Sequence, residues 1–187
     1  MLRDTWALKA QREGYRSRAV YKLDEILVKV KYKNKSCKVL DIGCAPGGWS
    51  DYLLKKYPKS SVYGIDLLDI KPLKGLKFFR EDICNIDNIP KIYNKKGSFD
   101  LVISDLAPNL SGIRDVDESN IHELNLVTLR TANRYLNNNG TFIVKTFQNT
   151  LLKNFRIEME NYFSLVQTFK PAASKSKSGE IYLYGDK

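Results

Sequence analysis

Short apolar runs rich in β-branched and aromatic residues alternate with longer amphipathic patterns along almost the whole chain. This alternation is typical of an α/β protein in which helices cover both faces of a mostly parallel sheet. The apolar runs predict seven strands, at 38–43, 62–66, 76–80, 99–104, 140–147, 163–170 and 180–185. The patterns between them predict helices near 18–30, 48–57, 87–94, 117–136 and 150–161.

The last two expected strands are joined by residues 171–179, which carry no helical pattern. Because a parallel pair needs a long crossover connection, we expect these strands to be antiparallel and to lie at one end of the sheet. The polar stretches 29–38, 94–97 and 137–139 are interpreted as loops or helix ends, and residues 137–140 as the end of the preceding helix. One domain spanning 1–187 is expected.

The net charge of the chain indicates which class of partner it binds. The chain has 31 Lys and Arg against 21 Asp and Glu, which gives a formal net charge of +10. A basic surface attracts phosphate polyanions, so nucleic acid is the expected partner class. No apolar run approaches the roughly 18–20 residues that span a bilayer, which argues against a membrane role.

The cysteines and the N-terminal arginines bear on location. Three cysteines without CxxC spacing predict neither a disulfide framework nor a metal site, and they favour a reducing compartment. Arginines among the first eighteen residues are a feature of transit peptides, but Asp4 and Glu13 are atypical of one, so this stretch is interpreted as mature protein. We expect an intracellular monomer, with a mitochondrion or other organelle, the cytoplasm and the nucleolus left open.

A glycine-rich segment follows the first expected strand. Residues 39–50, VLDIGCAPGGWS, run from an apolar strand through small residues into a helix, which lets a ligand approach the backbone closely. The segment predicts a site for a nucleotide-type cofactor, although a tight strand-to-helix turn needs glycine for structural reasons alone. The GxGxxG pattern that favours a pyrophosphate is absent, because Gly43 is followed by Cys44-Ala45-Pro46. NAD is therefore disfavoured.

Acidic residues follow the next two expected strands. Asp66 ends the second strand, where a carboxylate can accept hydrogen bonds from both hydroxyls of an adenosine ribose. Asp82 follows the third strand, where it can accept from an adenine amino group. Alone, Asp66 could be a strand-end cap and Asp82 a solvated loop acid. With the glycine-rich segment, they favour a cofactor that contains adenosine.

Together with residues 43–50, the segment 104–112, SDLAPNLSG, closely resembles the FtsJ/RrmJ family of ribose 2′-O-methyltransferases. The resemblance covers nearly the whole chain and includes 15–26, YRSRAVYKLDEI, then 144–147, VKTF, and 178–182, SGEIY. It implies a seven-stranded Rossmann-like methyltransferase sheet, S-adenosylmethionine as cofactor and RNA as substrate. The order of the predicted strands agrees with such a sheet.

The resemblance also implies roles for particular residues. The family's cofactor residues fall on Gly47, Trp49, Asp66, Asp82 and Asp105, to which Gly43 of the glycine-rich segment is added. Its catalytic tetrad, Lys-Asp-Lys-Glu, falls on Lys22, Asp105, Lys145 and Glu180. A displacement on an activated methyl group requires positioning of the 2′-oxygen and removal of its proton, and no metal. Lys145 is the expected base if its amine is neutral, and a role in orienting the hydroxyl alone stays open.

The identity of the RNA depends on shorter phrases. Residues 66–73, DLLDIKPL, and 112–117, GIRDVD, look most like the bacterial-type and mitochondrial family members that modify a uridine of large-subunit ribosomal RNA. A transfer RNA or messenger RNA cap 2′-O-methyltransferase is the alternative within the same class. A ribosome assembly factor with dispensable catalysis is the alternative outside it, and the four retained tetrad residues argue against it.

Basic residues predict the surface that meets RNA. The candidates before the first strand are Lys9, Arg12, Arg16 and Arg18, interleaved with aromatic residues suited to base stacking, and those on the last loop are Lys175 and Lys177. A packed helix with a solvated face, or a solvated loop, explains the same residues. The chain shows no RRM or KH pattern, so specificity is expected from this surface or from a preformed ribosomal particle. His122, the only histidine, is interpreted as solvated or capping.

Overall fold

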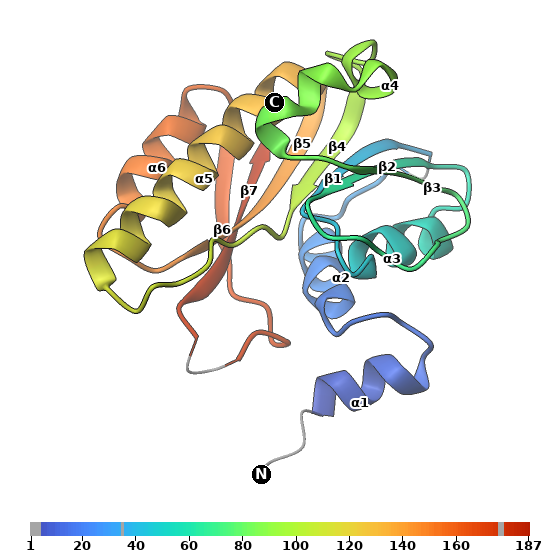
Figure 1. Ribbon diagram of the computed structural model, residues 1–187, viewed down its shortest axis with the longest axis horizontal. Helices are drawn as coiled ribbons and strands as arrows, with labels where there is room; N and C mark the ends of the chain where they lie inside the picture. The colour runs from blue at the N-terminus through green and yellow to red at the C-terminus, as the bar shows by residue number, and fades with distance from the viewer. Residues whose placement is uncertain (1–4, 35, 176–177) are drawn as a thin grey trace.

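The computed structural model describes residues 5–34, 36–175 and 178–187. Its strands form one sheet in the order β3-β2-β1-β4-β5-β7-β6 (Figure 1). The strands are β1 Lys38–Ile42, β2 Ser61–Asp66, β3 Leu76–Arg80, β4 Phe99–Ser104, β5 Leu136–Phe147, β6 Leu165–Phe169 and β7 Glu180–Asp186. The helices are α1 Thr5–Arg12, α2 Ala19–Lys29, α3 Gly48–Lys56, the 3-10 helix η1 Ile83–Asn88, α4 Pro90–Tyr93, α5 Arg114–Tyr135 and α6 Leu152–Glu160.

The pairing of the strands agrees with the sequence. Strands β3, β2, β1, β4 and β5 are parallel to one another, and β7 runs antiparallel to both β5 and β6. The expected mostly parallel sheet with an antiparallel pair at one end is confirmed. In β4, Leu101 and Ile103 pack into one core and Val102 into the other, because successive side chains of a strand point to opposite faces.

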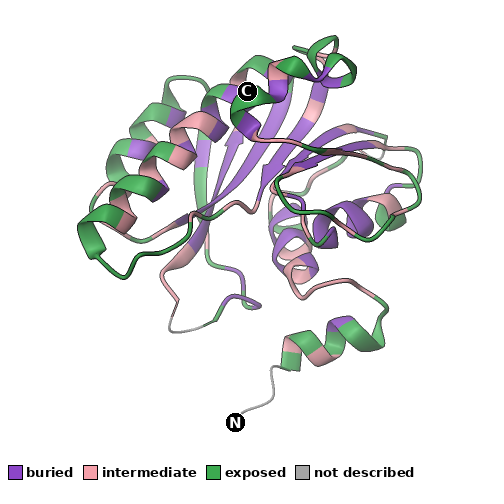
Figure 2. Ribbon diagram, in the orientation of Figure 1, coloured by how far each residue is buried: buried purple, intermediate pink, exposed green. Residues whose placement is uncertain are grey.

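Helices cover both faces of the sheet. One core joins the sheet to α5, α6, η1 and α4, and its largest side chains include Tyr135, Phe142 and Phe155. The second core joins the other face to α2 and α3 through residues such as Leu23 and Leu53. Figure 2 shows the inner strands β2, β1, β4, β5 and β7 as a mostly buried layer, whereas the edge strands β3 and β6 are partly exposed. Helix α1 is mostly exposed and lies beyond α2. None of the helices in the described ranges is long and apolar enough to cross a membrane.

Two local expectations were wrong, and one alternative left open is now decided. Helix α1 lies outside the ranges expected as helices but agrees with the interpretation of the N-terminal basic and aromatic residues as a packed helix; it packs Trp6 against Tyr21, with ring centroids 5.2 Å apart. The helix expected at 87–94 is divided into η1 and α4, because Pro90 at the first turn of α4 has no N–H to continue the preceding turn. Residues 137–139, expected as a loop, belong to β5 through a register shift, and Asn137 Nδ2 donates to Asp100 Oδ1 at 2.9 Å.

The topology brings the expected site to one edge of the sheet. Gly43 directly follows β1, Asp66 ends β2, and Asp105 directly follows β4. The carboxyl ends of parallel strands share one edge of the sheet, so these residues lie at the same edge. Lys145 lies near the carboxyl end of β5. Glu180 begins β7, and because β7 is antiparallel, its first residue lies at the same edge, paired with Phe147.

Candidate active site

The glycine-rich segment wraps the carboxyl end of β1. Gly43 donates its N–H to the carbonyl of Ile65 at 2.8 Å, and its φ of 74° lies in the left-handed region. A Cβ at Gly43 would lie 2.4 Å from Leu106 Cδ2 and would force that side chain to shift, so glycine suits both the positive φ and the close approach of the two loops. Gly47, with φ 97°, precedes the first residue of α3 and directs the chain into that helix.

Asp66 is held rigidly at the end of β2. Its Oδ2 accepts a hydrogen bond from Ala45 N, and its Oδ1 accepts one from Leu68 N, both at 2.8 Å. These contacts join the glycine-rich segment to the loop after β2. A carboxylate oxygen can accept more than one hydrogen bond, so Asp66 keeps acceptor capacity for a ligand.

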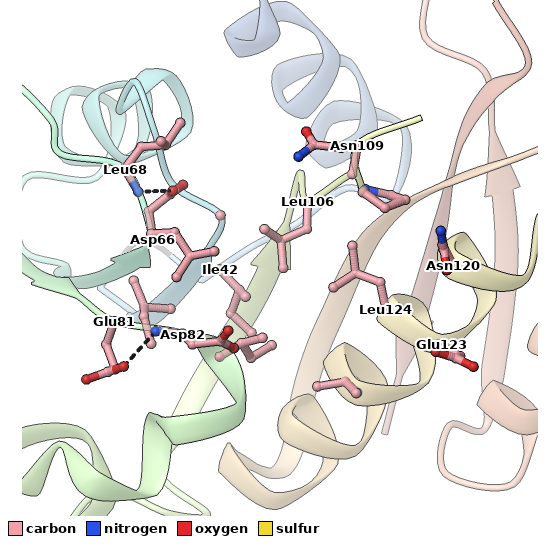
Figure 3. A pocket seen from close by; sticks show the side chains of 17 residues that line it. Ile42, Asp66, Leu68, Glu81, Asp82, Leu106, Asn109, Asn120, Glu123 and Leu124 are labelled. Carbon is pink, nitrogen blue, oxygen red and sulfur yellow. Dashed lines mark hydrogen bonds between the residues drawn. The ribbon is translucent and has the colours of Figure 1, made fainter. Parts of the chain in front are cut away.

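A cavity of about 600 Å³ opens beside Asp66. Figure 3 shows Asp66 and Asp82 on one side of this cavity, and Asn120 and Leu124 of α5 on the other, with Leu106 and Asn109 between them. The volume lies in the range of cofactor and small-molecule sites. The structure therefore brings Gly43, Asp66 and Asp82 together around one cavity.

The lining of the cavity is acidic, in contrast to the basic chain. Four of its residues carry carboxyl groups, namely Asp66, Glu81, Asp82 and Glu123, and among the described residues that line it none is Lys or Arg. Asp82 Oδ1 also accepts from Cys84 N at 2.8 Å and caps η1. Such a lining favours a ligand of positive charge and disfavours a pyrophosphate.

A second, much smaller cavity of about 20 Å³ adjoins the first at Gly43, which lines both. Asp41, Trp49 and Asp105 also line it. Asp41 is only 1% exposed; its Oδ2 accepts from Ser50 Oγ at 2.6 Å, and its Oδ1 has no hydrogen-bond partner among the described residues. A buried carboxylate oxygen without a donor is costly, and a donor or cation on a ligand would satisfy it.

Burial raises the pKa of Asp41 to about 7, with the nearby charges of Asp105 and Asp66 acting in the same direction. The folded protein therefore holds this proton more tightly than the unfolded chain, whose carboxyl has the ordinary value of 3.8. The contribution of this proton to the free energy of unfolding is fully present below pH 4 and is lost as pH rises through about 7. With about 1.4 kcal/mol per pKa unit, the loss amounts to about 4 kcal/mol.

We expect Asp41→Asn to remove this dependence of the free energy of unfolding on pH. Relative to the wild type, the free energy of unfolding of Asp41→Asn should increase between pH 4 and pH 8, because asparagine cannot ionise. Urea unfolding of both ligand-free proteins across this range measures the difference. Parallel stability curves for the two proteins would show that Asp41 is ionised in the folded state throughout.

The four tetrad residues lie together in one hydrogen-bonded network. Lys22 Nζ contacts Glu180 Oε1 at 2.7 Å, and Lys145 Nζ contacts Asp105 Oδ1 at 3.2 Å and also donates to the backbone carbonyl of Asp105. The hydroxyl of Tyr182 joins the two pairs: it accepts from Lys22 Nζ at 3.2 Å and donates to Asp105 Oδ1 at 2.9 Å. The lysines are only 6% and 9% exposed, so neither is an ordinary surface charge.

Strand register explains this arrangement. Lys145 of β5 is paired directly with Tyr182 of β7, so both side chains point to the same face of the sheet. Glu180 lies two residues before Tyr182 and shares that face. Tyr182 packs in the core formed with α2 and α3, and Lys22 reaches the network from α2.

The ionisation states of two members follow from their surroundings. Burial raises the pKa of Glu180, but hydrogen bonds from Lys22 and Ser174 outweigh it and hold that pKa below its ordinary value. Burial, with the carboxylates of Asp105 and Glu180, strongly raises the pKa of the Tyr182 hydroxyl. Glu180 is therefore ionised at neutral pH, and Tyr182 keeps the proton that it donates to Asp105.

Three of the expected cofactor residues, Asp105, Trp49 and Gly47, do not line the larger cavity, and Asp105 lines only the smaller one. Trp49 is 3% exposed; its Nε1 donates to Ala19 O at 2.7 Å, and its ring packs against Tyr182, with centroids 5.8 Å apart. It therefore lines only the smaller cavity. Gly47 lines neither cavity, and the guanidinium of Arg16 lies beside it. A cofactor contact of Gly47 stays a prediction.

The expected RNA residues do not form one uniform surface. Arg16 donates to the carbonyls of Lys71 and Pro72, each at 2.6 Å, and so ties the N-terminal segment to the loop after β2. Lys9 is exposed, lies over the Tyr21 ring at 4.6 Å and faces Glu13.

The other expected RNA residues differ in exposure. Arg12 and Lys175 are exposed, Arg18 is half-buried, and Lys177 lies outside the described residues. Contacts of these residues with RNA stay predictions. His122 was expected to be solvated or capping; it is half-buried on α5, and its Nδ1 has no hydrogen-bond partner in the described ranges.

Three residues of the site were not identified from the sequence: Tyr182, Asp41 and Ser174. Tyr182 could have been found, because the two-residue period of a strand places it on the face of Glu180. Asp41 lies inside the glycine-rich segment and carried a weaker signal. Ser174 lies in a loop between two strands, where no pattern of the sequence marks it.

The strand order, the loop after β1 and the lysine–carboxylate network beside an acidic cavity define an α/β enzyme with a Rossmann-like ligand site. A family model described as FtsJ-like methyltransferase matches residues 15–187, and the chain belongs to this family. The chain is therefore a methyltransferase, and its reaction requires a methyl donor.

Individual relatives agree with this assignment. The chain is 42% identical to a ribosomal RNA large subunit methyltransferase E of Coxiella burnetii, over 97% of this chain and 89% of the relative. It is 39% identical to a protein of the same name from Methanothrix thermoacetophila, over 99% of this chain and 72% of the relative. A crystal structure of a ribosomal RNA methyltransferase from Plasmodium falciparum matches with a TM-score of 0.79 and 32% identity, over 92% and 97% of the two chains.

Proposed function

We propose that this methyltransferase transfers a methyl group from S-adenosylmethionine to a ribose 2′-hydroxyl of ribosomal RNA, at a uridine of the large subunit. The observation that carries the proposal is the network of Lys22, Asp105, Lys145 and Glu180 at the edge of the sheet where the cavity opens. Asp105 belongs to the network, and the residues that follow it line the cavity.

The cavity residues fit S-adenosylmethionine. This cofactor carries a sulfonium and an ammonium group, so its net charge is positive, and it supplies a methyl group already activated for displacement. The acidic lining suits that charge, and Asp66 and Asp82 would hold the ribose and the adenine. The Oδ1 of Asp41, which has no hydrogen-bond partner in the part of the chain that the structure describes, offers a further acceptor beside the smaller cavity.

The network residues would act on the 2′-hydroxyl. Lys145 Nζ is the atom proposed to orient this hydroxyl and to take its proton, with Asp105 fixing the direction of the lysine. Lys22 adds a second amino group to the same network. Glu180 and Tyr182 hold Lys22 in place.

Large-subunit ribosomal RNA is proposed as the substrate on two grounds. The relatives from Coxiella burnetii and Methanothrix thermoacetophila bear the name of ribosomal RNA large subunit methyltransferases. The chain's net charge of +10 supports binding to a phosphate backbone. Exposed Arg12 and Lys175 are proposed to contribute phosphate contacts, with Lys9, Arg16, Arg18 and Lys177 as further candidates.

Mapping of 2′-O-methyl positions across all cellular RNAs tests the proposal. Depletion of the protein should remove methylation at one position of large-subunit ribosomal RNA, and the wild-type gene should restore it. Methylation elsewhere should stay unchanged, which serves as the internal control. Loss confined to transfer RNA or to messenger RNA caps would contradict the proposed substrate, and an unchanged map would contradict the proposed function.

A further inference from the structure

The connection between β6 and β7 has two parts of opposite character. Pro171, Ala173 and Ser174 are buried, whereas Lys175 is exposed. Burial of three residues in a row of four is unusual for a loop, because loops run over the surface and keep their polar groups in water. This first part of the connection is therefore packed as an element of the fold.

Helix α2 supplies the surface on which this part packs. Ala172 donates its N–H to Glu25 Oε2 at 2.8 Å, and Glu25 lies three residues after Lys22 on the same helix. Residues three apart on a helix are neighbours on one face. Ser174 N donates to the carbonyl of Pro171 at 3.0 Å, which fixes the turn that carries the serine. The face of α2 that holds Lys22 thus also holds this loop.

The side chain of Ser174 contacts the catalytic tetrad. Its Oγ donates to Glu180 Oε1 at 2.7 Å, the same oxygen that contacts Lys22 Nζ at 2.7 Å. The serine is 9% exposed, so water competes poorly for this hydrogen bond. Two donors from different elements, α2 and the loop, therefore restrict the rotation of one carboxylate.

We propose that Ser174 is a positioning residue of the active site: its hydroxyl holds the Glu180 carboxylate in the orientation in which Glu180 fixes Lys22. The proposal rests on the proposed function and adds a member that acts through Glu180 without touching the substrate. Lys22 from α2 and Lys145 from β5 lower the pKa of the Glu180 carboxyl, Lys170 Nζ donates to the Glu180 backbone carbonyl at 2.7 Å, and Tyr182 of β7 lies beside them.

Replacing the hydroxyl tests the proposal. With ribosomal particles and cofactor saturating, Ser174→Ala should lower kcat about ten- to hundredfold, the usual effect of one hydrogen bond to a charged group. KM for the particles should stay within about twofold of the wild type, since Ser174 is not proposed to bind RNA. Ser174→Thr keeps a hydroxyl and should have a kcat close to that of the wild type. Ser174→Val, which has the shape of threonine but no hydroxyl, should have the low kcat of Ser174→Ala.

A titration that does not depend on activity accompanies the kinetics. The hydrogen bond from Ser174 lowers the pKa of Glu180, so the carboxyl signal of ¹³C-labelled Glu180 should titrate at higher pH in Ser174→Ala. This measurement remains valid if the wild type transfers no methyl group to the particles, an outcome that would contradict the proposed function and not the role of Ser174.

Matched variants separate positioning from a general loss of structure. Ser164→Ala is the control, because Ser164 Oγ donates to the carbonyl of Asp186 at 3.0 Å, at the far end of β7. In a Glu180→Ala background, Ser174→Ala should cause no further loss, because the two residues act together. Unchanged kcat and an unchanged Glu180 titration in Ser174→Ala, or independent losses in the double variant, would overturn the proposal.

Discussion

Lys145→Ala is expected to abolish methyl transfer while the fold, cofactor affinity and RNA affinity stay close to those of the wild type. The removal of a general base typically lowers a rate by about 10² to 10⁴-fold, and more if the same group aligns the reacting hydroxyl. Lys145 contacts Asp105 at the edge of the sheet, and the cavity proposed to hold the cofactor is lined by other residues. The loss should therefore fall on the chemical step.

Single-turnover transfer of labelled methyl to ribosomal particles measures this effect. Lys153→Ala is the matched control, because Lys153 is an exposed lysine of α6 on a part of the chain that contributes nothing to the tetrad. Its rate should equal that of the wild type. Thermal unfolding and calorimetric titration with S-adenosylhomocysteine check the fold and the cofactor site. Transfer by Lys145→Ala at a near wild-type rate would remove Lys145 from the proposed mechanism.

Asp66→Ala is expected to weaken cofactor binding about a hundredfold. Two hydrogen bonds from ribose hydroxyls to a carboxylate, at about 1.5 kcal/mol each, correspond to a factor of this size. Asp66 also accepts hydrogen bonds from Ala45 N and Leu68 N, so its removal leaves two backbone donors of the proposed cofactor site without their partner. Both effects act in the same direction.

Calorimetric titration of the ligand-free proteins with S-adenosylhomocysteine gives the affinities. Asp69→Ala is the control, because Asp69 lies in the same loop but is largely exposed and pairs with Arg80 at 2.7 Å. This variant should bind like the wild type, since a surface ion pair contributes little. Equal affinities for wild type and Asp66→Ala would exclude Asp66 from the ribose site.

The order of the elements and the edge that carries the site could be predicted from the sequence alone. Hydrophobic periods of two residues in strands and of about 3.6 in helices are local properties, so they are readable without knowledge of contacts. Because parallel strands end at one edge, the positions of Gly43, Asp66 and Asp105 at the carboxyl ends of three parallel strands were sufficient to bring them together. Local rules failed where long-range pairing decides, as in the extension of β5 through Asn137 and Asp100.

The connections within the site required the tertiary structure. Tyr182 lies 160 residues from Lys22 in sequence and joins it to Asp105 through hydrogen bonds that depend on the register of β5 with β7. The tertiary structure likewise shows that Arg16 donates hydrogen bonds to the backbone carbonyls of Lys71 and Pro72. The sequence by itself determined which chemical groups reach the edge of the sheet, because side-chain periodicity is local. Only the folded chain decided which of those groups touch, because hydrogen bonds depend on distances that packing and register set.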